Sequence, residues 1–97
     1  MNMRFQPRPV TRSTAFHCRA PHAHQVSIVV RPVKEGPATT HPMQKTLDGS
    51  WHIALELPRG RYLYRFVVDG HPTLDPASHG SVPDDHGGMY STREVGH

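Results

Sequence analysis

Nine histidines and one cysteine are the residues of this 97-residue chain best suited to metal ligation or nucleophilic chemistry. His22 and His24 are two residues apart, a spacing that directs both side chains to one side of an extended segment. Structural zinc sites use four ligands in paired spacings, and no such pairing accompanies Cys18 and these histidines. The sequence therefore predicts no metal site, and we interpret the histidines as surface residues.

Groups for covalent or acid–base catalysis are also poorly arranged. Cys18 belongs to a predicted edge strand, where no helix N-terminus would activate its thiol. Asp84 and Asp85 are adjacent, so their side chains point apart instead of converging across a cleft. The chain has neither a Gly-x-Ser-x-Gly motif nor a phosphate-binding glycine loop. We therefore expect a non-catalytic protein that uses no cofactor.

Aromatic side chains, which can stack on sugar rings, are the remaining candidates for a binding function. Tyr62 and Tyr64 alternate with Phe66 on one side of a predicted strand, so we expect them to be buried. Trp51 begins another alternating strand and is interpreted as a core residue. Tyr90 follows the polar stretch DDHGG, and we predict that it forms an exposed aromatic platform.

About seven short strands must position these residues. Alternating apolar residues, bounded by turn-forming residues, predict strands at 14–19, 25–31, 43–47, 51–57, 61–68, a short return near 72, and 89–95. Asp69-Gly70 is the strongest hairpin signal, because a type I′ turn requires positive φ at both central residues. No segment is predicted to be helical. The pattern therefore predicts an all-β, immunoglobulin-like β-sandwich of two antiparallel sheets.

Composition is consistent with one small, turn-rich domain. Residues 1–12 include two prolines among basic residues and are predicted to form a flexible N-terminal arm, followed by the sandwich at 13–97. A single cysteine excludes an internal disulfide, and there is no apolar run of signal-peptide or membrane-span length. The formal charge of +3 is scattered along the chain. We therefore expect a cytoplasmic protein that binds neither nucleic acid nor membranes.

Five short motifs follow one another in the second half of the chain. They are Gly49 to Trp51, Leu57 to Gly60, Tyr62 to Gly70, Asp75-Pro76 and Asp84 to Ser91. Their order resembles carbohydrate-binding module family 48, and the resemblance covers about Ser13 to Val95. This family includes the glycogen-binding domain of AMP-activated protein kinase β subunits and the N-terminal domain of isoamylases and branching enzymes.

The resemblance implies binding to an α-glucan such as glycogen or starch, with an altered set of sugar-contacting residues. Arg65 matches the basic residue of the family's Tyr-Lys-Phe triplet, which contacts the sugar. The two stacking tryptophans of glycogen-binding members are replaced, one near Glu35 and one by Pro72, and Tyr90 replaces an asparagine. The predicted carbohydrate-binding residues are Arg65, His71, His86 and Tyr90.

A second hypothesis remains open at this point. With both tryptophan positions changed, the domain can be a degenerate module whose binding face contacts a protein. The partner would then be an enzyme of glycogen metabolism or another protein.

Overall fold

The structure is a computed structural model of the whole chain, and it describes residues 10–34, 36–78, 80–83 and 88–96. These residues form strands and connecting loops without a helix. The strands are β1 (Thr11–Arg19), β2 (Val26–Pro32), β3 (Thr39–Pro42), β4 (Gln44–Lys45), β5 (Ser50–Pro58), β6 (Gly60–Val68), β7 (His71–Thr73), β8 (Ser81–Pro83) and β9 (Met89–Val95).

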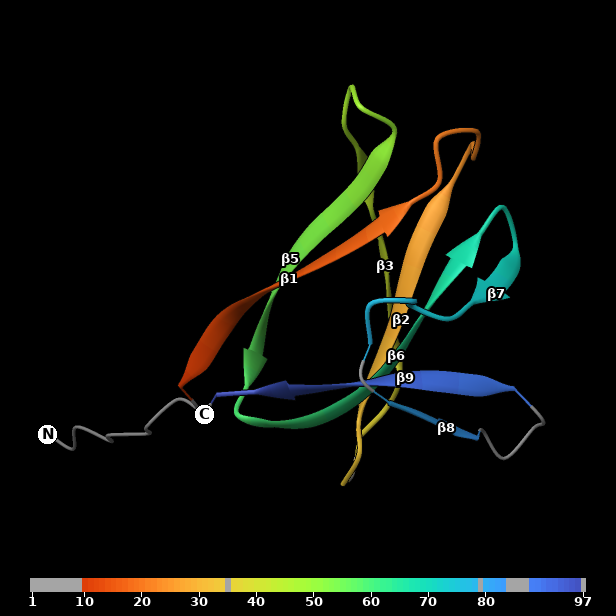
Figure 1. Cartoon of the computed structure of the whole chain (residues 1–97). Helices are drawn as coiled ribbons and strands as arrows, with labels where there is room; N and C mark the ends of the chain where they lie inside the picture. The colour runs from red at the N-terminus through yellow and green to blue at the C-terminus, as the bar shows by residue number, and fades with distance from the viewer. Residues whose placement is uncertain (1–9, 35, 79, 84–87, 97) are drawn as a thin grey trace, which may run out of the picture.

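The strands form two antiparallel sheets, as the sequence predicts (Figure 1). The smaller sheet has the order β1-β5-β4, and the larger has the order β3-β2-β6-β9-β8. Strand β7 also belongs to the larger sheet, since it pairs with the last residues of β6 while β9 pairs with the first ones. The predicted immunoglobulin-like β-sandwich is therefore confirmed.

Two strands lie in segments that we predicted to be loops. β3 and β8 are short edge strands in which no residue is buried. Without buried positions they carry no alternating apolar pattern. β4 and β7 have no buried residue either, but β4 follows the buried Met43 and β7 follows the Asp69-Gly70 turn signal. Thr11 and Arg12, which we assigned to the N-terminal arm, are instead the first residues of β1 and pair with Pro58 and Leu57.

The core lies between the sheets and is built by the alternating strands. Tyr62, Tyr64 and Phe66 of β6 are at most 7% exposed, as predicted. Tyr64 makes edge-to-face contacts with Phe66 and, across the two layers, with Phe16 of β1, at centroid distances of 5.9 and 4.9 Å. Trp51 of β5 is also buried, and its indole N–H donates to the Ala20 carbonyl at 3.0 Å. These aromatic contacts join the sheets.

Asp69 and Asp75, which belong to two of the motifs identified in the sequence, hold loops in place. The Asp69 carboxylate accepts hydrogen bonds of 2.8 Å from the backbone N–H groups of His24 and Gln25, which ties the β1–β2 loop to the β6–β7 turn. Asp75 accepts a hydrogen bond from the buried Tyr64 hydroxyl at 2.6 Å and another from the Ala77 N–H at 2.9 Å. Both aspartates therefore have a structural role.

Candidate functional site

The candidate site is the outer face of the larger sheet, the side turned away from the core. Because Tyr64 and Phe66 point inward, the alternation of β6 places Leu63 and Arg65 on the outer face. The register aligns Arg65 with Val29 of β2 and Leu63 with Arg31 of the same strand. The position of Arg65 opposite the core residues therefore agrees with the alternation of the sequence.

Tyr90 of β9 also lies on this face, beneath two arginines. The Arg65 guanidinium carbon is 4.5 Å from the centroid of the Tyr90 ring, and that of Arg31 is 5.6 Å from it. Guanidinium groups stack favourably on aromatic rings because their charge meets the negative face of the π system. We call Arg31, Arg65 and Tyr90 the arginine–tyrosine cluster. It is drawn from three neighbouring strands, β2, β6 and β9.

The expectation that Tyr90 is an exposed aromatic platform is wrong. Only 6% of this residue is exposed, because the two arginines cover its ring and β9 is flanked by β6 on one side and β8 on the other. Its ring is available to support the arginines and not to stack on a ligand. In β2 the preceding residue Val30 points to the core, so alternation places Arg31 on the outer face. This alternation is visible in the sequence and could have identified Arg31 as a residue of the site.

The structure does not bring His71 to the cluster. His71 pairs with Val68, so it lies on the side of the strand that faces the core, at an exposed position next to the β6–β7 turn. The next residue, Pro72, pairs with Val67 and therefore shares the outer face with Arg65. The fourth predicted site residue, His86, lies outside the described residues.

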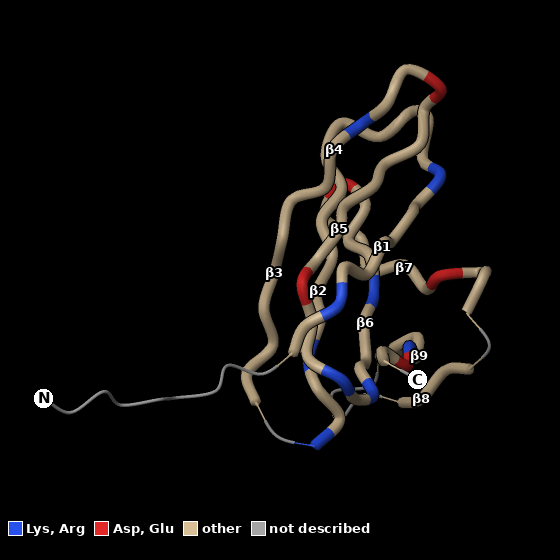
Figure 2. The backbone as a smooth tube through the Cα atoms, turned by 90° about the vertical axis from the view of Figure 1, so that its left-hand side faces the viewer, with Lys and Arg blue, Asp and Glu red and all other residues tan. Residues whose placement is uncertain are grey.

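Several basic residues lie near one end of the larger sheet (Figure 2). In Figure 2 the blue Lys and Arg segments follow β6 and surround the lower ends of β2 and β6, whereas the red acidic segments occur singly. Farther along the face, Arg61 of β6 forms an ion pair of 2.6 Å with Glu94 of β9, and both side chains are largely exposed. The face therefore offers cationic donors next to half-buried apolar side chains such as Val29 and Val67.

Two hollows of the surface lie apart from the arginine–tyrosine cluster. One, of about 350 Å³, is lined by the end of β2 and the β5–β6 turn, including Val33, Lys34 and Arg59. The other, of about 310 Å³, opens between β1 and β9 and includes Phe16 and Asp75. Neither of them is lined by Arg65 or Tyr90.

Neither a larger cluster of metal ligands nor an activated nucleophile is found within the described part of the chain. There, no group of three or more His, Cys, Asp or Glu side chains is arranged to hold a metal ion. Cys18 is buried, and burial, followed by the negative charge of Asp75, raises the pKa of its thiol. A high thiol pKa opposes the thiolate form that acts as a nucleophile. The Asp84-Asp85 pair lies outside the described residues.

Comparisons with known proteins relate the sequence to a carbohydrate-binding module and the fold to part of the pullulanases. Residues 3–78 match the family model described as carbohydrate-binding module 48 (isoamylase N-terminal domain). No curated protein sequence matches the chain. Among the described residues, no helix is long and apolar enough to span a membrane.

Solved structures of pullulanases share the fold. A type I pullulanase from Bacillus subtilis str. 168, complexed with maltose, aligns with a TM-score of 0.63, 16% identity, 91% of this chain and 13% of its own length. An apo pullulanase from Paenibacillus barengoltzii aligns with a TM-score of 0.57, 21% identity, 91% of this chain and 14% of its own length. A pullulanase from Bacillus acidopullulyticus aligns with a TM-score of 0.54 and 22% identity, and the alignment covers 89% of this chain and 12% of the pullulanase. The chain thus corresponds to a small part of these enzymes.

Proposed function

Because the chain belongs to the carbohydrate-binding module 48 family, we propose that it binds an α-glucan of the glycogen or starch type without acting on it. The observation that carries the proposal is the position of Arg65, which is held over Tyr90 on the outer face of the larger sheet. This arginine occupies the position at which the family resemblance places a basic sugar-contacting residue. Its guanidinium group donates hydrogen bonds in a fixed planar geometry that suits the hydroxyl groups of a sugar.

The mode of binding differs from stacking on tryptophan. Tyr90 is buried beneath Arg31 and Arg65, so the arginines, and not the ring, meet the ligand. Pro72 and Val67 share that side of the sheet and offer apolar contact beside the charged groups. Without an exposed aromatic ring, binding should be weak, with a Kd of about 1 mM, which corresponds to about −4 kcal/mol.

The fold also supports a role beside a catalytic unit. The pullulanases that share it carry the corresponding region as 12–14% of their length. We propose that this module likewise holds an α-glucan near an enzyme that processes it. Protein contact without glucan binding is the competing hypothesis, and the experiment below separates the two.

Affinity electrophoresis through gels that contain glycogen or amylose tests glucan binding. We expect the wild-type protein to be retarded relative to a gel without polysaccharide, and Arg65→Ala to remove most of the retardation. Arg19→Ala is the matched control, because Arg19 is an exposed arginine at the end of β1 in the other sheet. A wild-type protein that folds but is not retarded would refute the proposal. Retardation that Arg65→Ala leaves unchanged would refute the site alone.

Substitutions of Tyr90 test whether this ring positions the arginines. Tyr90→Phe keeps the aromatic face and should retain glucan binding, whereas Tyr90→Leu should weaken it together with the fold. A cation–π contact of this kind contributes about 0.5–2 kcal/mol, so we expect Tyr90→Leu to lower the free energy of unfolding by at least this amount. Equal retardation of the two variants would show that Arg65 needs no support from the ring.

A further inference from the structure

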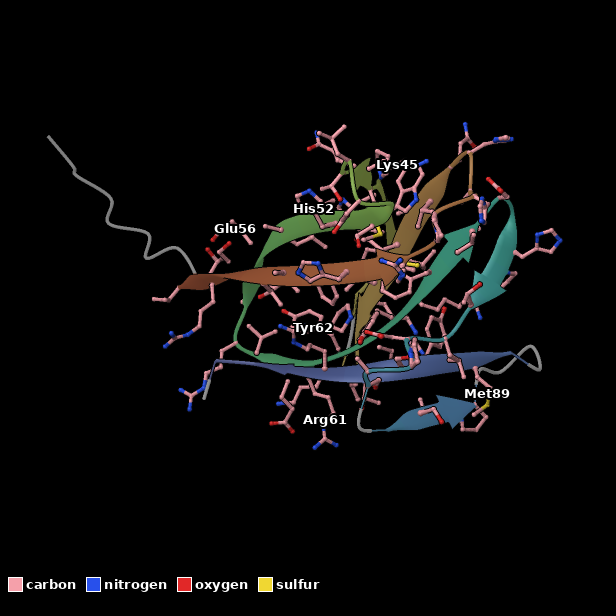
Figure 3. All side chains as sticks on the ribbon, turned by 45° about the horizontal axis from the view of Figure 1, so that its top comes forward. Lys45, His52, Glu56, Arg61, Tyr62 and Met89 are labelled. Carbon is pink, nitrogen blue, oxygen red and sulfur yellow. The ribbon has the colours of Figure 1, made fainter. Side chains whose placement is uncertain are left out.

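The outer face of the smaller sheet carries a pair of histidines that the sequence does not bring together. His17 of β1 pairs directly with His52 of β5. Both residues are exposed, their ring planes are inclined by only 15°, and the ring centroids are 6.1 Å apart. In Figure 3 the labelled His52 lies on β5, beside the neighbouring strand β1. Two imidazoles are therefore held side by side by the sheet.

The surroundings of this pair leave space for an ion. The adjacent positions on the same face are the pair Ala15 and Ala54 on one side, which have small side chains, and the pair Arg19 and Ser50 on the other. Gln44 of β4 pairs with His52, so an amide side chain continues the row His17–His52–Gln44 across all three strands. Within the described part of the chain, no hydrogen bond occupies a nitrogen of either imidazole ring.

These features suit a transition-metal ion. Neutral imidazole is a preferred ligand of Zn²⁺, and each nitrogen would lie about 2.0–2.1 Å from the ion. Side chains at directly opposed strand positions have Cβ atoms about 4.5–5.5 Å apart, and exposed side chains change rotamer easily, so the rings can converge on one ion. The strand pairing fixes the backbone positions from which the two side chains extend before any ion binds.

We propose that His17 and His52 form a two-ligand site for Zn²⁺ on the outer face of the smaller sheet. Structural zinc sites have four protein ligands and catalytic sites have three, so two histidines leave coordination positions open to water. With fewer protein ligands, binding should be weaker than at a structural zinc site and reversible. The site is on the sheet opposite to the arginine–tyrosine cluster, so it does not depend on glucan binding.

Isothermal titration of the full chain with zinc chloride at pH 7.5 tests the proposal. We expect one saturable step in the wild-type protein and its loss in both His17→Ala and His52→Ala. His71→Ala is the matched control, because it removes an exposed histidine outside the pair and should leave the step unchanged. Absence of a saturable step in the wild-type protein, or an equal loss in all three variants, would overturn the proposal.

Thermal unfolding supplies a second measurement. An ion that binds only the folded protein raises its Tm by mass action. Zinc should therefore raise the Tm of the wild-type protein and of His71→Ala, but not that of His17→Ala or His52→Ala. Because both paired histidines are exposed, these variants should fold, and their Tm without zinc verifies this. A zinc-dependent rise that persists in the variants of the pair would also contradict the site.

Discussion

Tyr64 shows how one hydroxyl group in the core makes stability depend on pH. It donates to Asp75, and burial, followed by the hydrogen bond and negative charge of that carboxylate, raises the pKa of the Tyr64 phenol. In the unfolded chain the tyrosine pKa is about 10. At a pH between this value and the higher pKa of the folded state, the unfolded protein binds fewer protons than the folded protein. Stability from this residue is complete below about pH 10 and declines as the pH rises further.

We therefore expect Tyr64→Phe to have two effects on urea unfolding. At pH 7 it should lower the free energy of unfolding by about 1.5–3 kcal/mol, since a hydrogen bond to a charged group is lost. Between pH 9 and 11.5 its stability should decline less than that of the wild-type protein. Tyr62, whose phenol pKa is also raised by burial, is present in both proteins, so their difference isolates Tyr64. Parallel pH profiles would contradict this explanation.

At the scale of the element, the β6–β7 hairpin has the turn that its sequence predicts. Asp69 and Gly70 have φ values of 49° and 86°, so both central residues are in the left-handed region. Hydrogen bonds from His24 and Gln25 stabilise the ionised form and, despite the opposing effect of partial desolvation, lower the pKa of the Asp69 carboxylate. This contribution to stability is present above the carboxylate's unfolded pKa of about 4 and is lost as the pH falls below it.

Gly70→Ala tests the demand of this turn on the backbone. A Cβ atom at position 70 would meet no atom within 4 Å, so the effect is one of backbone conformation alone. We expect a loss of about 1–2 kcal/mol in the free energy of unfolding, the usual difference for a residue with a Cβ in the left-handed region. Gly70→Asn should be milder, because asparagine adopts this region more readily. Equal stability of Gly70→Ala and the wild-type protein would show that the turn relaxes.

For the whole molecule, the contact between Phe16 and Tyr64 is the main aromatic link across the two layers. Phe16 is 2% exposed, and the guanidinium carbon of Arg93 lies over its ring, 5.1 Å from the centroid. Phe16→Ala should lower the free energy of unfolding by about 3–5 kcal/mol, a large share of the total of about 5–15 kcal/mol expected for a small domain. Phe16→Leu should lose less. Chemical denaturation measures both, and a loss below about 1 kcal/mol for Phe16→Ala would contradict this role.

The layers of the sandwich could be predicted from sequence because they depend on alternation within single strands. Trp51, Tyr64 and Phe66 are buried where their spacing places them, and Arg65 is outside. The burial of Tyr90 could not be predicted in this way, because it depends on arginines from two other strands.

The same limit applies to the histidine pair on the smaller sheet. His17 and His52 become neighbours only through the register of β1 with β5, which the spacing of residues along one strand does not reveal. Sequence patterns thus identified the faces of the strands, but not the partners that meet across them.

The burial of Trp51 determines how this protein can be observed. It is the only tryptophan of the chain, it lies in the core of the smaller sheet, and its indole N–H is bonded to the Ala20 carbonyl. Its fluorescence should report loss of the folded state by a red shift of the emission on exposure to water. The arginine–tyrosine cluster lies on the far side of the other sheet, so a sugar bound there would leave this emission nearly unchanged. Intrinsic fluorescence is therefore a probe of folding for this module, and a flat fluorescence titration with a sugar carries no information about glucan binding.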